Sequence, residues 1–273
     1  MLKQRVLTAL VLLPLVMLAI FALPPAWFLV LLGVILLLAS REYAPLAGYT
    51  GAAGTYLLPV VQGIILALLF GYRSSWDSAI AQFAGLACLA WLLMFSRLPL
   101  YRPGAKADNT YRLLSSLTAI LSITTGWFAL SWIRMRPDGS WLILLLLLIV
   151  WAADTGAYFA GVSFGKRKLA RHISPGKTQA GFVGGMIAAP LVAMLAASLM
   201  PLAAFDPTSL ILLAIVTMLA SVCGDLLISM HKRTSGCKDS GNLLPGHGGV
   251  LDRLDSLLAA APFFVLGLVI AGY

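Results

Sequence analysis

Charged residues are scarce in this sequence. Asp, Glu, Lys and Arg together form 11% of the 273 residues, whereas they form about a quarter of an average soluble domain. Hydrophobic residues form 60% of the chain, and its mean hydropathy is +0.95. So few charges exclude an ordinary soluble protein, and the composition predicts a polytopic integral membrane protein with the lipid bilayer as its solvent.

Cysteine is also rare, with Cys88, Cys223 and Cys237 as the only three. Their number is odd, and they form neither a CxxC pair nor a Cys/His spacing typical of metal sites. This excludes a disulfide framework and a zinc site. Acidic residues are few as well, which leaves a net charge of +9. Because the basic residues are dispersed among loops between apolar runs, we interpret the excess as a topology signal and expect no nucleic-acid partner.

Apolar runs follow one another along the whole chain, without a convincing repeat, a low-complexity tract or a separate soluble domain. They predict an all-α fold of about nine transmembrane helices in a single polytopic membrane domain, residues 1–273. The expected spans are 6–23, 26–40, 54–72, 78–96, 113–133, 141–161, 181–200, 208–231 and 250–272. The first run resembles a signal peptide, but it is long and lacks a clear cleavage site, so we expect a retained helix. Only three residues separate the first two spans, which either form a tight hairpin or cross the bilayer incompletely.

Lys and Arg are distributed unequally between the two sides of the membrane that this count defines. Sixteen of the 19 fall on the side of the N-terminus, and only Arg73, Arg134 and Arg136 fall on the other. The positive-inside rule therefore predicts a cytoplasmic N-terminus in the inner (plasma) membrane of a cell. The loops 162–180 and 232–249 would then face the cytosol.

The segment from Gly224 to Ser256 concentrates polar residues, and it reads GDLLISMHKRTSGCKDSGNLLPGHGGVLDRLDS. On its first helix, Asp225, Ser229 and Lys232 are spaced i, i+4, i+7 and should share one face. On its second helix, Asp252 and Asp255 are i, i+3 neighbours whose carboxylates can converge. Carboxylates of this kind hold hard cations such as Mg²⁺.

The loop between those two helices is basic and rich in glycine. Basic side chains and free backbone N–H groups bind phosphates, so a loop next to three carboxylates suggests nucleotide chemistry at a membrane surface. Its candidate phosphate contacts are Lys232, Arg233, Lys238, His247, Gly248 and Gly249. For His247 we favour a structural or phosphate contact over a role as general base, because a lone histidine is weak support for proton transfer.

Two carboxylates, Asp154 and Asp225, lie inside apolar runs. A carboxylate at mid-membrane costs roughly 2.5–3.5 kcal/mol, so such residues are usually functional, although pairing with a nearby Lys or Arg is an alternative. At about 1.5 Å per residue, both lie about 10 Å from the cytosolic end of their helices, level with Asp252 and Asp255. We therefore expect four carboxylates just below the cytosolic headgroups, where a lipid phosphate lies.

The other cytosolic loop reads GVSFGKRKLARHISPGKTQAGFVGG from Gly161 to Gly185. Ser174, Lys177 and Thr178 come directly before a predicted helix, where free N–H groups and the helix dipole favour an anionic oxygen. The segment is not a P-loop, since it lacks GxxxxGK[ST] and a preceding strand. We expect His172 and His231 to lie at headgroup level.

Taken together, these motifs resemble the phosphatidate cytidylyltransferase (CDP-diacylglycerol synthase) family. The long signature appears in order as SMHKR from Ser229, KD at 238–239 and PGHGGVLDRLD ending at Asp255. Asp154, Tyr158 and Gly161 resemble the family's DxxAYxxG element, and 174–185 resembles SPxKTxEGxxGG. The resemblance is strong for the catalytic half, 140–273, and extends to 1–135 only in hydrophobicity. Where the family often has Trp-Glu, this chain has Gln179-Ala180.

The resemblance implies transfer of the cytidylyl group of CTP to phosphatidate, giving CDP-diacylglycerol and pyrophosphate. Catalysis would involve Asp225, Ser229, Lys232, Asp252 and Asp255. One or two cations, at least one of them Mg²⁺, would bind Asp225, Asp252 and Asp255. Phosphates would contact Lys177, Lys232, Arg233, Lys238, His247, Gly248, Gly249 and Arg253. Secondary roles would fall to Asp154, Ser174, Thr178 and Asp239. The family also implies a homodimer.

Two other functions remain open from the residues alone. A CTP-dependent lipid kinase of the polyprenol type would use a similar cation site but would transfer the γ-phosphate to an alcohol. An ion or lipid transporter would use intramembrane acids to bind the translocated cation. The basic, glycine-rich loop disfavours the transporter, which has no use for triphosphate contacts.

Overall fold

The protein is built from nine α-helices and one short β-hairpin, as seen in a computed structural model that describes residues 2–104, 107–202, 205–244, 246 and 248–273. The helices are α1 (Leu2–Ala22), α2 (Pro25–Leu46), α3 (Gly51–Gly71), α4 (Trp76–Phe95), α5 (Asn109–Arg134), α6 (Gly139–Phe164), α7 (Gln179–Leu199), α8 (Pro207–Thr234) and α9 (Leu251–Ile270). A 3-10 turn, η1 (Arg73–Ser75), precedes α4, and the hairpin consists of β1 (Lys168–Ala170) and β2 (Ser174–Thr178). The predicted all-α membrane fold is confirmed.

Each predicted span corresponds to one helix. Within the described residues, α2 to α9 are long and apolar enough to cross a membrane, which makes eight candidate spans. The helix α1 is 21 residues long, and its apolar stretch includes Leu10–Ala22. Pro24 caps α2 and Pro25 is its first residue, where a proline costs no hydrogen bond, so the chain reverses within a few residues.

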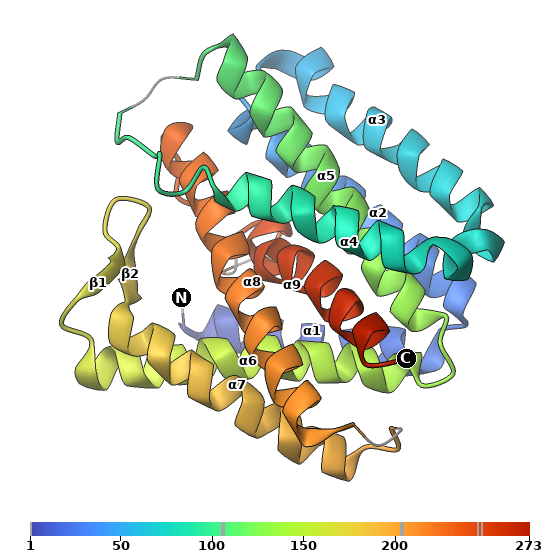
Figure 1. Ribbon diagram of the computed structural model, residues 1–273. Coiled ribbons are helices and arrows are strands. Elements are labelled where there is room, and N and C mark those ends of the chain that lie inside the picture. Colours follow the sequence, from blue (N-terminus) through green and yellow to red (C-terminus); the bar gives the residue numbers. More distant parts are fainter. Residues whose placement is uncertain (1, 105–106, 203–204, 245, 247) are drawn as a thin grey trace.

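The helices α8 and α9 lie in the middle of the molecule (Figure 1). On one side they pack against the N-terminal helices, α9 against α4 and α5, and α2 against both α8 and α9. On the other side α8 packs against α7, and α6 contacts α8 and α9. The loop that joins α8 to α9 therefore lies where the N-terminal and C-terminal parts of the chain meet.

The helices α6 and α7 pack closely along faces of small residues. A Cβ atom added to Gly184 would lie 2.5 Å from both Ala160 Cβ and Gly156 O, and one added to Gly156 would lie 2.5 Å from Ala188 Cβ. Small residues allow such close approach between helices in a membrane. This contact sets the position of Asp154 on α6 relative to the segment that precedes α7.

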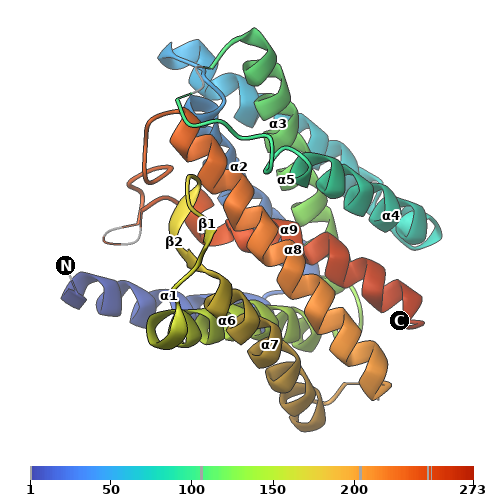
Figure 2. The same ribbon diagram turned by 60° about the vertical axis from the view of Figure 1, so that its left-hand side comes forward.

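That preceding segment contains the hairpin, which the sequence analysis did not predict. Lys168 pairs with Thr178 and Ala170 with Ser174 in an antiparallel ladder. Lys, Pro and Gly are poor strand formers, so local propensity does not reveal these strands. Instead, β2 packs against α6, α7 and α8, and the hairpin lies beside α8 in both ribbon views (Figure 2).

His231, which we expected at headgroup level, is covered by protein. Its side chain is completely buried between the rings of Tyr43 and Tyr111, and Tyr43 Oη lies 3.4 Å from its Nδ1 atom. The reason is that α8 continues to Thr234, three residues beyond the expected end of the span, and this last turn packs against α2. The end of α8 is thus covered by protein.

We predict that Gly184→Ala destabilises the protein by about 1–3 kcal/mol, because the new methyl group meets Ala160 and the backbone of Gly156. The matched control is Gly85→Ala on α4, where nothing lies within 4 Å of an added Cβ and where alanine improves helix propensity. Thermal unfolding of the purified protein in detergent, followed by tryptophan fluorescence, measures both variants. Equal midpoints for the two would contradict the close contact between α6 and α7.

Candidate functional site

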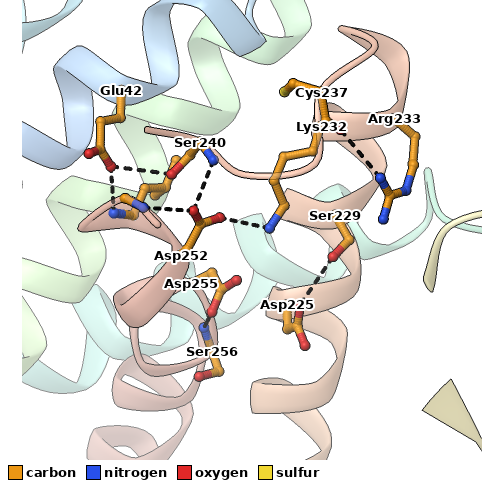
Figure 3. Close-up of polar contacts among 12 residues, drawn as sticks. Glu42, Asp225, Ser229, Lys232, Arg233, Cys237, Ser240, Asp252, Asp255 and Ser256 are labelled. Carbon is orange, nitrogen blue, oxygen red and sulfur yellow. Dashed lines mark hydrogen bonds and ion pairs between the residues drawn. The ribbon is translucent and has the colours of Figure 1, made fainter. Parts of the chain in front are cut away.

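Asp252, in the first turn of α9, joins three parts of the chain (Figure 3). Its Oδ1 atom accepts a hydrogen bond of 2.8 Å from Lys232 Nζ, at the end of α8. Its Oδ2 atom accepts 2.9 Å hydrogen bonds from the backbone N–H groups of Ser240 and Gly249 in the loop. One carboxylate therefore fixes the end of α8, both ends of the glycine-rich segment and the start of α9.

The ion pair between Lys232 and Asp252 is shielded from its surroundings. The two side chains are only 9% and 6% exposed. Removing one partner of a buried pair leaves an uncompensated charge and typically costs about 3–5 kcal/mol. An ammonium group has three donors, and Asp252 Oδ1 is the one acceptor that the described residues show for this ammonium. Lys232 is thus held in place with donor capacity left for an anionic ligand.

Asp225, seven residues earlier on α8, forms a second ion pair. Its Oδ2 atom lies 2.6 Å from Lys177 Nζ, which β2 provides. Its Oδ1 atom accepts a 3.1 Å hydrogen bond from Ser229 Oγ, one turn further along α8. Asp225, Ser229 and Lys232 share a face of α8, as their spacing predicts, and the hairpin loop reaches this face through Lys177.

Two cavities adjoin one another near this face of α8 and share Asp154 of α6 in their linings. The first has a volume of about 440 Å³ and is polar, and its charged lining residues are Asp154, Asp225, Lys232, Asp239, Asp252, Arg253 and Asp255. The second has a volume of about 500 Å³ and is more apolar, and its polar lining residues include Asp154, Tyr158, Lys168, Lys177 and Thr178. Asp154 lines both cavities, and the Lys177–Asp225 ion pair joins a residue of each.

The carboxylates of the polar cavity have the chemistry of a site for a hard cation. Asp255 is buried, with its Oδ1 accepting a hydrogen bond from Ser256 N, and it lines the cavity together with Asp225 and Asp252. Across the part of the chain that is described, no three His, Cys, Asp or Glu side chains gather into a ready-made metal site. Mg²⁺ commonly takes one or two carboxylates and completes its shell with substrate phosphates and water, so the residues fit that ion.

The basic residues of the loop differ in what they contact. Arg233 donates to two backbone oxygens, from Nε to Ile173 O at 3.1 Å and from Nη1 to Cys237 O at 3.3 Å. It thereby ties the hairpin to the α8–α9 loop, and it does not line either of the two cavities. Lys238 is exposed and lines neither, whereas Arg253 is exposed and lines the polar cavity.

Among the residues expected to have secondary roles, Thr178 caps a helix. It is buried, and its Oγ1 atom accepts a 3.0 Å hydrogen bond from Gly181 N, which caps the N-terminus of α7. Ser174 begins β2 and is half-buried, without a place in either cavity.

The glycine-rich turn itself contains Gly248, whose φ of +82° favours glycine and whose carbonyl accepts a hydrogen bond from Leu244 N. An added Cβ on Gly248 would lie 2.9 Å from Asp252 Oδ2 and 3.5 Å from Asp239 Cβ. The backbone here thus passes directly beside two cavity carboxylates. His247 lies outside the described residues.

Glu42, on α2, is a residue that the sequence analysis missed. It is the only glutamate in the chain, and it is buried next to the α8–α9 loop. Its Oε2 atom accepts hydrogen bonds from Leu251 N at 2.8 Å and from Ser240 Oγ at 3.2 Å (Figure 3). The rule that identified Asp154 and Asp225 did not reach it, because Glu42 lies beyond the predicted span 26–40 and directly follows Arg41.

Comparison with known proteins agrees with this geometry. The sequence matches the cytidylyltransferase family over residues 3–271. It is 40% identical to the phosphatidate cytidylyltransferase of Pseudomonas aeruginosa over 276 residues, which cover 100% of this chain and 99% of the relative. It is 36% identical to the Haemophilus influenzae protein of the same name, with 97% of both chains covered. A Bacillus subtilis phosphatidate cytidylyltransferase is 47% identical over 131 residues, 46% of this chain and 47% of the relative. The chain therefore belongs to the cytidylyltransferase family.

Proposed function

We propose that this protein is a nucleotidyltransferase that moves the cytidylyl group of CTP to phosphatidate, giving CDP-diacylglycerol and pyrophosphate for phospholipid synthesis. The observation that carries the proposal is the polar cavity, in which membrane helices bring buried carboxylates together with Lys232 and a loop rich in glycine. Two phosphatidate cytidylyltransferases that match this chain over nearly its full length support the same activity.

The reaction needs two anions to meet. An oxygen of the phosphatidate phosphate attacks the α-phosphorus of CTP, the bond from that phosphorus to the oxygen leading to the β-phosphate breaks, and pyrophosphate leaves with the bonding electrons. The attacking oxygen is already anionic, so neither a covalent enzyme nucleophile nor a strong base is required. Such transfers depend mainly on positioning and on neutralising charge. Lys232 would supply charge to the triphosphate, while Ser229 and Asp252 hold the groups around it.

One or two cations, at least one of them Mg²⁺, would be held by Asp225, Asp252 and Asp255. When bound, the ion would neutralise the charge of the phosphates and stabilise the leaving oxygen. Contacts within the protein already orient these carboxylates. Ser229 and Lys177 hold the two oxygens of Asp225, Lys232 and two loop N–H groups hold those of Asp252, and Ser256 N donates to Asp255 Oδ1.

The two substrates would occupy the two cavities. CTP suits the polar cavity, which has more charged residues in its lining. Phosphatidate suits the more apolar cavity, because it is flanked by Tyr158 and Val162, exposed residues of α6 that can face lipid. Lys177 would then pair with the lipid phosphate at the place where the two cavities meet, with the acyl chains left in the bilayer. Arg253, which lines the polar cavity, and Gly248 beside it would contribute further phosphate contacts. For Lys238 and His247 a phosphate contact stays a prediction from the sequence.

The function is tested by incubating the purified protein with phosphatidate, Mg²⁺ and CTP labelled at either the α- or the γ-phosphate. We expect α-label in the lipid product, γ-label in pyrophosphate, and no transfer once the cation is chelated. Label from the γ position in lipid would instead identify a lipid kinase. Absence of both labels from lipid, with cation uptake into vesicles, would identify a transporter.

A prediction separates Lys232 from its neighbour Arg233. Lys232→Ala should lower kcat/KM by about 10- to 100-fold, since a hydrogen bond to a charged group contributes about 1.5–3 kcal/mol. Arg233→Ala should lower it less, because this guanidinium contacts backbone oxygens and not the cavity. Lys232→Arg should recover only part of the activity, because the planar guanidinium group of arginine fits poorly in a site shaped for the compact ammonium group of lysine.

The measurement is kcat/KM for CTP and for phosphatidate separately, with the amount of folded protein checked by size exclusion in detergent. The proposed roles are wrong if all three variants stay within about twofold of the unmodified protein.

The site would face the cytosol, where nucleoside triphosphates are present, with the protein in the inner (plasma) membrane. This orientation rests on the distribution of Lys and Arg. A homodimer also belongs to the proposal through the family resemblance alone, and chemical cross-linking in the membrane tests it.

We predict that a cysteine replacing the exposed Asn242 reacts with a membrane-impermeant thiol reagent only in inside-out vesicles. A cysteine replacing the exposed Ser74, between α3 and α4, should react only in right-side-out vesicles. Burial raises the pKa of the Cys237 thiol, which slows its reaction at neutral pH, but all three native cysteines are best replaced first. The reverse labelling pattern would overturn the orientation and the access of CTP to the site.

A further inference from the structure

We propose that Glu42 is a positioning residue for cytidylyl transfer, which holds the α8–α9 loop and the start of α9 in the conformation that presents Asp252 to the polar cavity. The inference rests on the proposed function and extends it to a helix outside the sequence signature. Glu42 itself does not line the cavity, so it acts through the residues that do.

The contacts of Glu42 lead to Asp252 by two short routes. Through Ser240, the Oγ atom donates to Glu42 while the backbone N–H donates to Asp252 Oδ2. Through Leu251, the backbone N–H donates to Glu42 and the next residue in the chain is Asp252 itself. A change in the position of the Glu42 carboxylate would therefore move both the loop and the helix that carry the Asp252 contacts.

Glu42 also supplies a hydrogen-bond acceptor for the N-terminus of α9. The residue before α9, Val250, has no side chain that caps the helix, although the first N–H groups of any helix need acceptors. The Glu42 carboxylate accepts from Leu251 N, the first residue of α9, and its negative charge interacts favourably with the positive end of the helix dipole. The acceptor that α9 needs thus comes from a residue 209 positions earlier in the chain.

Two loop glycines show how closely the carboxylate is packed. A Cβ atom on Gly241 would collide with Glu42 Oε1, and one on Gly249 would collide with Glu42 Oε2. Neither glycine has a positive φ, so backbone conformation does not require glycine at these positions. Space for the Glu42 side chain does require it. The loop backbone is therefore shaped around this carboxylate.

The Oε1 atom of Glu42 gives a reason to think that this residue positions the loop and does not merely stabilise the fold. Oε1 is buried and accepts no hydrogen bond from the described residues, and an incompletely satisfied buried carboxylate is unfavourable for folding. A residue that served stability alone would lose little as a neutral, isosteric glutamine. A residue that holds the loop by charge-assisted hydrogen bonds should weaken its hold on the loop when its charge is removed.

The test compares Glu42→Gln and Glu42→Ala with Tyr43→Phe. Tyr43 is the next residue on α2, is also buried, and its hydroxyl lies against His231 on α8, so it is a matched control. We expect Glu42→Ala to lower kcat by about 10- to 100-fold with little change in the KM for phosphatidate. Glu42→Gln should retain an intermediate activity, and Tyr43→Phe should stay within about twofold.

A second measurement reports the loop without reference to activity. Amide hydrogen exchange, followed by mass spectrometry, should become faster in Glu42→Ala over the peptide covering 239–251 and remain unchanged in α6 and α7. Unchanged kcat and unchanged exchange of this loop would overturn the inference. Faster exchange throughout the protein, with a lowered melting temperature, would also overturn it, because Glu42 would then stabilise the fold in general.

These outcomes are distinguishable from a failure of the proposed function. If the unmodified protein transfers no α-label from CTP to lipid, the cytidylyltransferase proposal fails whatever Glu42 does. If transfer occurs and Glu42→Ala is fully active, the role of Glu42 alone is wrong.

Discussion

The buried ion pair between Lys232 and Asp252 is the interaction on which the rest of the site depends. A charge within apolar helices is costly alone, and each of these two side chains compensates the other while almost inaccessible from outside. Their pairing brings the end of α8 against the start of α9, and the second oxygen of Asp252 then fixes the loop between them through two backbone N–H groups. The glycine-rich loop has its shape because its ends are attached to one carboxylate. Without these two hydrogen bonds, nothing among the contacts of Asp252 would hold the N–H groups of Ser240 and Gly249 beside the cavity.

A second ion pair, Lys177–Asp225, connects the β-hairpin to α8. It is more exposed than the first, with side chains 24% and 30% accessible, so it contributes less to stability and is easier to open. Its partners come from the β-hairpin and from α8, and each lines a different cavity. In the proposed reaction, a phosphate group beside Lys177 would compete with Asp225 for the same ammonium and would leave that carboxylate available to a cation. Binding of an anion and binding of a cation would thus favour each other at the place where the cavities meet.

Hydropathy was sufficient to place the nine helices of the described part of the chain, because an apolar span in a bilayer must be about 20 residues long and leaves a clear pattern. Helical spacing also placed Asp225, Ser229 and Lys232 on one face correctly. The hairpin β1–β2 was not predicted, since its residues have little strand propensity and pair only where α8 supports them. Nor was the burial of His231, which depends on how α2 packs against α8. Glu42 was missed because its partners lie 198 and 209 residues away, a separation that periodicity cannot bridge.

The contiguous signature from Ser229 to Asp255 contains residues with two different physical tasks. Lys232 and Asp252 face the cavity, whereas Arg233 and Gly249 shape the loop around it, one by holding backbone oxygens and the other by leaving space for Glu42. Adjacent residues on a helix are rotated by about 100°, and here Lys232 lines the polar cavity while Arg233 is held by the backbone oxygens of Ile173 and Cys237. A motif therefore marks where the chemistry occurs without saying which members touch the substrate. That distinction comes from the contacts, which also extend the site to α2, a helix with no part in the motif.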